Sequence, residues 1–241
     1  MGRLKDKIVL ITGAAGAVGS AVGEAVARAG GIAIATDLAG RDGIDHVLDV
    51  TSEDDWRRVA AEVDRAAGRI HGLVNAAGIA TLGTIEETDF ATWRRIMAVN
   101  LDGTFLGCKH AMPLLRRDGG AIVNLSSVSG LVGGHNLAAY NASKGGVRLL
   151  TKSVALYGAR FDPKVRCNSV HPAFLQGPMI DSIAAETGHP DGARARMTRE
   201  IPLGRLGSPA EAADLIVYLL SDEALFVTGA EFVIDGGLTA R

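Results

Sequence analysis

The sequence predicts an α/β protein in which a doubly wound parallel sheet of about seven strands carries helices on both faces. Short runs rich in β-branched residues alternate with longer amphipathic segments along the whole chain. A glycine-rich turn follows the first of these runs, as is typical of such sheets. The 241 residues contain no internal repeat, low-complexity tract or linker. We therefore expect one domain, residues 1–241, with a substantial core.

The predicted strands and helices follow one another regularly. The first strand, 7–12 (KIVLIT), leads into a helix over 17–30, where small apolar residues recur at helical spacing. Ser52 is a typical N-cap for a helix over 52–68, whose first turn is acidic. The same patterns predict further strands over 31–37, 44–50, 70–78, 120–127, 164–170 and 230–237, and further helices over 89–117, 138–160 and 208–220.

One segment interrupts this alternation. Residues 176–207 are mixed in charge, contain several prolines and lie between a predicted strand and the last helix. Long insertions in compact α/β domains commonly form lids or binding loops. We expect 176–207 to be a substrate lid; the alternative is a solvated surface excursion.

The composition argues against several classes of protein. The net charge is −2, with no long basic run, so the electrostatic footprint of a nucleic-acid-binding protein is missing. Cys108 and Cys167 are too few for a disulfide framework and lack metal-ligand spacing, which predicts two buried free thiols and no metal site. The sequence shows neither a signal peptide nor an apolar run of membrane-spanning length. We expect a cytoplasmic protein that binds no membrane.

The first turn has the context of a phosphate site but an unusual glycine pattern. In VLITGAAGAVGSAVG (9–23), Gly13, Gly16 and Gly19 are spaced three and three apart, which does not fit the G-x-G-x-x-G template. A helix N-terminus after a glycine turn offers unpaired N–H groups to an anion. A glycine-rich helix start that serves only packing remains the alternative.

Asp37 favours the nucleotide interpretation. It ends the second predicted strand, where a carboxylate can accept hydrogen bonds from both ribose hydroxyls of an adenosine. The same carboxylate would repel a 2′-phosphate, and the following Leu38 offers no cation to bind one. These residues together predict NAD rather than NADP.

A candidate proton-transfer group lies further along the chain. Tyr140 and Lys144 are four residues apart at the start of a predicted helix and therefore share a face, and Ser127 ends a predicted strand. A nearby ammonium favours the phenolate, which makes such a tyrosine a plausible general acid or base for an alcohol or ketone. The pair alone is a weak signal, because Tyr-x-x-x-Lys also occurs by chance.

In combination, these motifs resemble the short-chain dehydrogenase/reductase family over essentially the full chain. The matching stretches are TGAAGAVG, NAAG (75–78), MAVNLDGTF (97–105), IVNLSS (122–127), YNASK (140–144), VRCNSVHP (165–172) and VTGAEFVIDGG (227–237). The resemblance implies a Rossmann-like fold and a homo-oligomer, either a tetramer or a dimer.

The resemblance also implies roles for individual residues. Tyr140 would be the acid/base, Lys144 would lower its pKa and hold the nicotinamide ribose, Ser127 would orient the substrate oxygen, and Asn100 would anchor a water. Asp49 and the following Val50 correspond to the position that contacts the adenine. The expected contacts with NAD are Gly13, Gly16, Ala17, Val18, Gly19, Asp37, Leu38, Asp49, Val50, Asn75, Ala76, Gly78, Tyr140, Lys144, Pro172, Phe174 and Leu175.

The chain departs from the family pattern at three places. Ala17 stands where the family has its middle glycine, with Gly16 one position earlier. Ala173 replaces a glycine, and Gly177 replaces a threonine that would bond the nicotinamide carboxamide. Gln176 is a candidate substitute for that contact.

The resulting hypothesis is an NAD-dependent enzyme that interconverts a hydrophobic secondary alcohol (cyclic, aryl or hydroxysteroid-like) and its ketone. A 3-oxoacyl-carrier-protein reductase is the alternative within the family, and Asp37 counts against it because those enzymes usually use NADPH. A catalytically silent NAD-binding module is the alternative outside enzymology. The candidate pocket residues are largely apolar: 130–136, Ala173, Phe174, Leu175, Met179, Ile183 and Met197.

Overall fold

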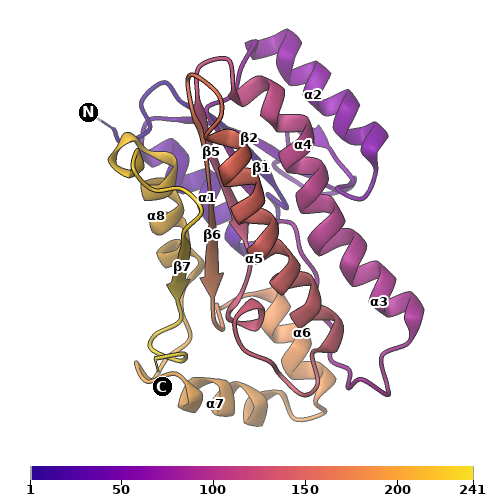
Figure 1. The fold of residues 1–241 in the computed structure, drawn as a ribbon. Coiled ribbons are helices and arrows are strands. Elements are labelled where there is room, and N and C mark those ends of the chain that lie inside the picture. The colour runs from indigo at the N-terminus through magenta and orange to yellow at the C-terminus, as the bar shows by residue number, and fades with distance from the viewer. Residues whose placement is uncertain (1, 241) are drawn as a thin grey trace.

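The computed structural model describes residues 2–240, which form a seven-stranded sheet with helices on both faces (Figure 1). The strands are β1 (Ile8–Thr12), β2 (Ile32–Asp37), β3 (His46–Val47), β4 (Gly72–Asn75), β5 (Gly120–Leu125), β6 (Val165–Pro172) and β7 (Glu231–Ile234). Their order is β3-β2-β1-β4-β5-β6-β7, and all neighbours run parallel. The predicted doubly wound, single-domain fold is confirmed.

The helices cover the sheet in two layers. They are α1 (Ala17–Arg28), α2 (Glu53–Ala67), α3 (Phe90–Met97), α4 (Gly103–Leu115), α5 (Ala138–Gly158), α6 (Pro178–Glu186), α7 (Pro190–Glu200) and α8 (Pro209–Leu220). On one face α1 and α8 pack over Val9 and Ile11 of β1. On the other face Leu10 belongs to a second core with residues of α2 and α4. This alternation follows from the two-residue period of strand side chains.

Two predicted elements differ most from the structure, and the strands expected over 70–78 and 230–237 are shortened to β4 and β7. The strand expected over 44–50 is reduced to the two residues of β3, which pair only with the end of β2 at the edge of the sheet. The helix expected over 89–117 is divided into α3 and α4 by a π-helical turn, Ala98–Asp102. At this turn the N–H of Gly103 donates to Ala98, five residues back, which inserts one extra residue into the helix.

Residues 176–207 form helices rather than an irregular loop. α6 and α7 lie together at the end of the molecule toward which the strands point (Figure 1). Their two ends are joined at the base, because the Gln176 N–H donates to the Gly207 carbonyl at 2.8 Å and the Gly207 N–H donates to Phe174 at 3.0 Å. The segment is therefore a closed excursion over the carboxyl ends of the strands. No helix within residues 2–240 is both long and apolar enough to cross a membrane.

Candidate active site

The candidate site lies between β1 and β4, where the order in which strands are added to the sheet changes direction. β1 and β4 are neighbours, but the chain continues from β1 to β2 on one side and from β4 to β5 on the other. Crevices at such switch points, outside the carboxyl ends of the strands, are the usual ligand sites of open α/β sheets. The turn after β1 and the segments after β4 and β5 all open there.

The turn between β1 and α1 needs glycine at two of its three glycine positions. Gly13 has φ +64°, and an added Cβ would lie 2.7 Å from the Cα of Ala77. At Gly19 an added Cβ would lie 2.1 Å from the carbonyl oxygen of Gly13. Gly16 has an ordinary φ of −77° and is the N-cap of α1. The turn therefore brings the α1 N-terminus close to β4, as a phosphate site requires.

Two of the unusual residues lie against each other. Ala17 is the first residue of α1, and Gly177 is the N-cap of α6. Gly177 has φ +142°, and an added Cβ there would lie 2.8 Å from the Cβ of Ala17. The methyl group of Ala17 thus occupies space that a side chain at position 177 would need.

Asp37 is attached to the same turn. Its Oδ2 accepts from the Ala15 N–H at 3.0 Å, and its Oδ1 accepts from the Leu38 N–H at 2.8 Å. The Leu38 side chain is half-exposed beside it. The structure therefore places a carboxylate and an apolar residue next to the glycine turn.

The predicted adenine loop is held by α2. Asp49 Oδ1 accepts from the backbone N–H and the hydroxyl of Thr51, and its own N–H donates to Asp55 at 3.0 Å. The Val50 side chain is 8% exposed and packs against Gly103 of α4. A cofactor contact at Val50 would therefore involve its backbone, not its side chain.

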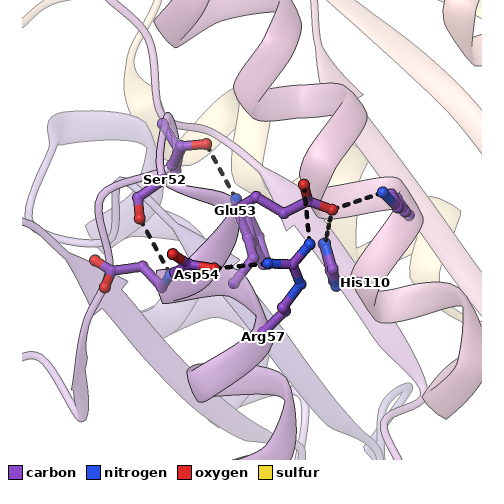
Figure 2. A network of polar contacts seen from close by, with 9 residues as sticks. Ser52, Glu53, Asp54, Arg57 and His110 are labelled. Carbon is purple, nitrogen blue, oxygen red and sulfur yellow. Dashed lines mark hydrogen bonds and ion pairs between the residues drawn. The ribbon is translucent and has the colours of Figure 1, made fainter.

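A polar network fixes the start of α2 to α4 (Figure 2). Glu53 accepts from Lys109 at 2.6 Å and contacts His110 at 3.2 Å, and Arg57 lies 3.2 Å away on its other oxygen. The hydrogen bond from Lys109, followed by that from His110, lowers the pKa of Glu53. This network positions the loop that ends at Ser52, which caps α2.

Asn75 is the last residue of β4, and its side chain is buried between the sheet and α4. Its side chain is 3% exposed and donates to Asn124 of β5 at 2.8 Å. α4 approaches it so closely that a Cβ on Gly107 would lie 2.3 Å from its Oδ1. The next residue, Ala76, donates its N–H to Thr12 Oγ1 at 3.1 Å. The sequence did not mark Thr12 or Asn124, because buried threonine and asparagine carry no signal that separates a structural role from a ligand contact.

Gly78, Asn100 and Lys144 converge on one point. An added Cβ on Gly78 would lie 3.4 Å from Asn100 Oδ1 and 3.5 Å from Lys144 Nζ. Lys144 is buried, its Nζ donates to the Leu125 carbonyl at 2.7 Å, and it lies 5.7 Å from the centre of the Tyr140 ring. Burial lowers the pKa of Lys144 from 10.5 to about 8.

Asn100 lies in the π-helical turn, which directs its side chain away from α3 and α4. Its amide exchanges two hydrogen bonds of 2.9 Å with the backbone of Ile79 and donates to Ser143 at 3.0 Å. Ser143 in turn donates to the Tyr140 carbonyl at 2.8 Å. Ser143 is a link between Asn100 and Tyr140 that sequence reasoning missed.

The electrostatics of Tyr140 differ from the expectation. Burial raises the pKa of Tyr140, and a hydrogen bond with Ser127 acts in the opposite direction by stabilising the phenolate. The predicted lowering by Lys144 is not what this structure shows, because the ammonium is directed to the Leu125 carbonyl. Ser127 and Tyr140 nevertheless lie side by side, so both can contact one substrate oxygen.

The remaining predicted contacts surround the base of segment 176–207. Pro172 ends β6, and its carbonyl accepts a long hydrogen bond of 3.4 Å from Ser127 Oγ. Phe174 is held by Gly207, as described above, and Gln176 is exposed. Among the methionines of this segment, Met179 on α6 is 40% exposed, whereas Met197 on α7 is 5% exposed.

This arrangement combines a dinucleotide-type crevice with a hydroxyl, a phenol and an ammonium that can hold an oxygen and move its proton. It defines the class of NAD(P)-dependent oxidoreductases with a Rossmann-like fold.

Comparisons with known proteins narrow the class. A family profile described as enoyl-(acyl carrier protein) reductase matches residues 13–239. An NADP-dependent (R)-specific alcohol dehydrogenase from Lentilactobacillus kefiri is 37% identical, over 99% of each chain. A cyclopentanol dehydrogenase from a Comamonas species is 38% identical over all of both chains. The solved structure of Thermoplasma acidophilum aldohexose dehydrogenase in ligand-free form superposes with a TM-score of 0.91 at 36% identity, covering 100% of this chain and 96% of the other. The chain belongs to the short-chain dehydrogenase/reductase family.

Proposed function

We propose that the protein is an NAD-dependent dehydrogenase that interconverts a hydrophobic secondary alcohol and its ketone. The observation that carries the proposal is that Tyr140 lies beside both Ser127 and the buried Lys144, next to Gly78 in the segment after β4. A silent NAD-binding module would not need these groups in contact.

In the proposed reaction the substrate oxygen lies between Ser127 Oγ and the Tyr140 phenol. Bound NAD supplies the hydride acceptor for the substrate carbon. Tyr140, as phenolate, takes the hydroxyl proton, and the Ser127 hydroxyl donates to the same oxygen and fixes its direction. The hydrogen bond from Ser127 favours the phenolate, Lys144 lies beside the Tyr140 ring, and Asn100 anchors a water near Ile79 that carries the proton onward.

The first test is Tyr140→Phe. Removing the phenol eliminates the proton acceptor, so kcat for alcohol oxidation should fall by roughly 10²- to 10⁴-fold. The Kd for the cofactor should stay within about 2-fold, since the ring remains in place. Nicotinamide absorbance gives kcat, and calorimetry gives Kd. Near-normal turnover in the variant would refute the proposed role of Tyr140.

Asp37 and Leu38 favour NAD over NADP. The carboxylate beside the turn would repel a 2′-phosphate, and Leu38 brings no cation to it. The alternative is NADP, on which the Lentilactobacillus kefiri relative depends. Arg41 is exposed on the loop after β2 and is the candidate cation for a 2′-phosphate.

A cofactor-exchange experiment separates the two. The double variant Asp37→Ser/Leu38→Arg should shift the ratio of kcat/KM for NAD over NADP toward NADP by roughly 100-fold, because it exchanges a repulsion for an attraction. Arg41→Ala is the matched control and should leave the ratio unchanged. If Arg41→Ala alone abolishes use of NADP by a wild type that prefers it, the NAD assignment is wrong.

The proposed substrate is a hydrophobic cyclic, aryl or steroid-like alcohol. The residues around the lid base include Phe174 and Leu175, and Met179 is exposed on α6. The cyclopentanol dehydrogenase among the relatives agrees with such a substrate, whereas the aldohexose dehydrogenase indicates a sugar alternative. Initial rates with cyclopentanol, a hydroxysteroid, an aldohexose and a 3-oxoacyl thioester separate these classes, and a highest kcat/KM with the aldohexose or the thioester would overturn the assignment.

We further propose that the molecule works as a cytoplasmic homo-oligomer, a tetramer or a dimer, with 176–207 as its lid. Cys108 and Cys167 are buried free thiols, which agrees with a reducing compartment. Apolar side chains are exposed on the outer surfaces of α4 and α5, where Phe105 is 48% and Leu156 is 75% exposed. Such a face favours association with a second copy.

A further inference from the structure

His171 is a completely buried histidine at the end of β6 that contacts Ser127. Its Nδ1 lies 3.0 Å from the backbone carbonyl oxygen of Ser127. Its Nε2 lies 2.8 Å from Ser169 Oγ. The side chain is 0% exposed, so both contacts are shielded from water.

The imidazole contacts the Ser127 backbone just beyond the point where the backbone pairing of β5 and β6 ends. β5 and β6 pair in parallel as far as Leu125 and Val170, and the Ser126 N–H still donates to Val170 at 2.9 Å. The next nitrogen of β6 that faces β5 belongs to Pro172, which has no N–H to donate. Beyond this point the Nδ1–H of His171 is the group that connects β6 to the backbone of the Ser127 segment.

The proton positions on His171 follow from its partners. A carbonyl oxygen only accepts, so Nδ1 must carry the hydrogen. Nε2 of the neutral ring then accepts from the Ser169 hydroxyl. Burial lowers the pKa of His171 and keeps the ring neutral, while Glu231 from β7 acts against Arg148 and Lys144 from α5.

We propose that His171 is a positioning residue that holds Ser127 in place to contact the substrate oxygen and Tyr140. The Ser127 side chain has two further hydrogen bonds: its Oγ accepts from the Ser129 N–H at 3.1 Å and donates to Pro172 at 3.4 Å, and the Tyr140 phenol lies beside it. The contact from His171 is the short one that fixes its backbone to β6. The inference rests on the proposed function, since it assigns His171 to the same reaction.

A double-mutant cycle in activity tests this role. His171→Leu removes the donor and keeps an apolar side chain of similar bulk, so kcat should fall by roughly 10- to 100-fold, because small displacements of reacting groups are costly. His171→Asn keeps an amide N–H near the Nδ1 position and should retain most of kcat. In a Ser127→Ala background, His171→Leu should lower the residual kcat by less than about 2-fold, since the group it positions is gone. An equal fold-loss in both backgrounds, or an Asn variant as impaired as the Leu variant, would overturn the proposal.

A second readout does not depend on turnover. The chain has three tyrosines, so protein labelled with 3-fluorotyrosine gives few ¹⁹F resonances, and Tyr140→Phe assigns the one of interest. Ser127→Ala should shift this resonance, His171→Leu should shift it in the same direction, and the double variant should add no further shift. An unchanged resonance in His171→Leu would refute the positioning role even if no alcohol were a substrate. Absence of turnover in the wild type, with the expected ¹⁹F shifts, would instead refute the proposed function alone.

Discussion

At the scale of single residues, Lys144 carries its ammonium group in a dry environment. It is 4% exposed and donates a hydrogen bond to the Leu125 carbonyl, and no carboxylate of residues 2–240 forms an ion pair with it. The charge is therefore poorly compensated, which is why its pKa is about 8 instead of 10.5.

The lowered pKa of Lys144 makes the free energy of unfolding change with pH in the alkaline range. Between about pH 8 and 10.5 the unfolded chain binds a proton at Lys144 that the folded chain does not, so the free energy of unfolding rises with pH in this window. From about pH 8 to about pH 9.5 the contribution is roughly 2 kcal/mol. Urea denaturation of the wild type and of Lys144→Met at both pH values checks this. The free energy of unfolding of the wild type minus that of Lys144→Met should rise by that amount between the two pH values. A constant difference would show that the pKa of Lys144 is not lowered.

The sequence predicted the chemical groups of the site better than their connections. Ser127, Tyr140 and Lys144 were found because their spacing and residue types form a recognisable pattern. Thr12 and His171 were missed because each contacts a backbone atom far away in the sequence, and Ser143 was missed because its partner, the Asn100 side chain, is equally distant along the chain. The direction of the Tyr140 pKa was also missed, since it depends on where the Lys144 ammonium points and how deeply the phenol is buried.

At the scale of elements, the end of α8 depends on a buried arginine. Arg166 of β6 is 7% exposed and donates to the carbonyl oxygens of Leu219 at 2.8 Å, Ser221 at 3.1 Å and Val227 at 3.3 Å. It thereby satisfies carbonyl groups at the C-terminus of α8 that no helical N–H can reach.

Replacing this arginine should loosen α8 from the sheet. Arg166→Met keeps much of the aliphatic volume but leaves buried carbonyl oxygens unpaired, which should lower the free energy of unfolding by about 2–4 kcal/mol. Lys164→Met, at an exposed neighbouring position, is the matched control and should change it by less than about 0.5 kcal/mol. Urea denaturation gives both values. Equal effects in the two variants would remove Arg166 from this role.

The limits of sequence reasoning also differ between elements. The helices from 17, 52, 138 and 208 onward were predicted well, because their apolar periodicity or caps are clear. The π-helical turn at Asn100 was not, because one inserted residue barely disturbs a helical pattern. The strand expected over 44–50 was too long, because residues that flank a short edge strand can show the same alternation of apolar and polar residues without pairing.

At the scale of the whole molecule, the outer surface of α4 and α5 should decide the state of association. Leu149 is 68% and Leu156 75% exposed on this surface. The double variant Leu149→Glu/Leu156→Glu would bury charges in an interface formed by this surface, so we expect smaller assemblies by sedimentation.

Ile85→Glu is the control for this experiment. Ile85 is 78% exposed and lies in the segment between β4 and α3, outside helices α4 and α5. The control should leave the sedimentation coefficient of the wild type unchanged. A monomeric wild type, or a double variant that still assembles fully, would refute an interface on α4 and α5.

The contact between Ala17 and Gly177 has a consequence for how this chain can change over generations. A threonine at position 177 clashes with the Ala17 methyl group and suits φ +142° poorly. If Ala17→Gly comes first, the methyl group is gone and the backbone at 177 gains room to turn. Of the two orders in which both positions could acquire the residues usual in the family, only the one that begins at position 17 therefore avoids a damaged intermediate. Whether a threonine is tolerated at position 177 therefore depends on which residue is already present at position 17.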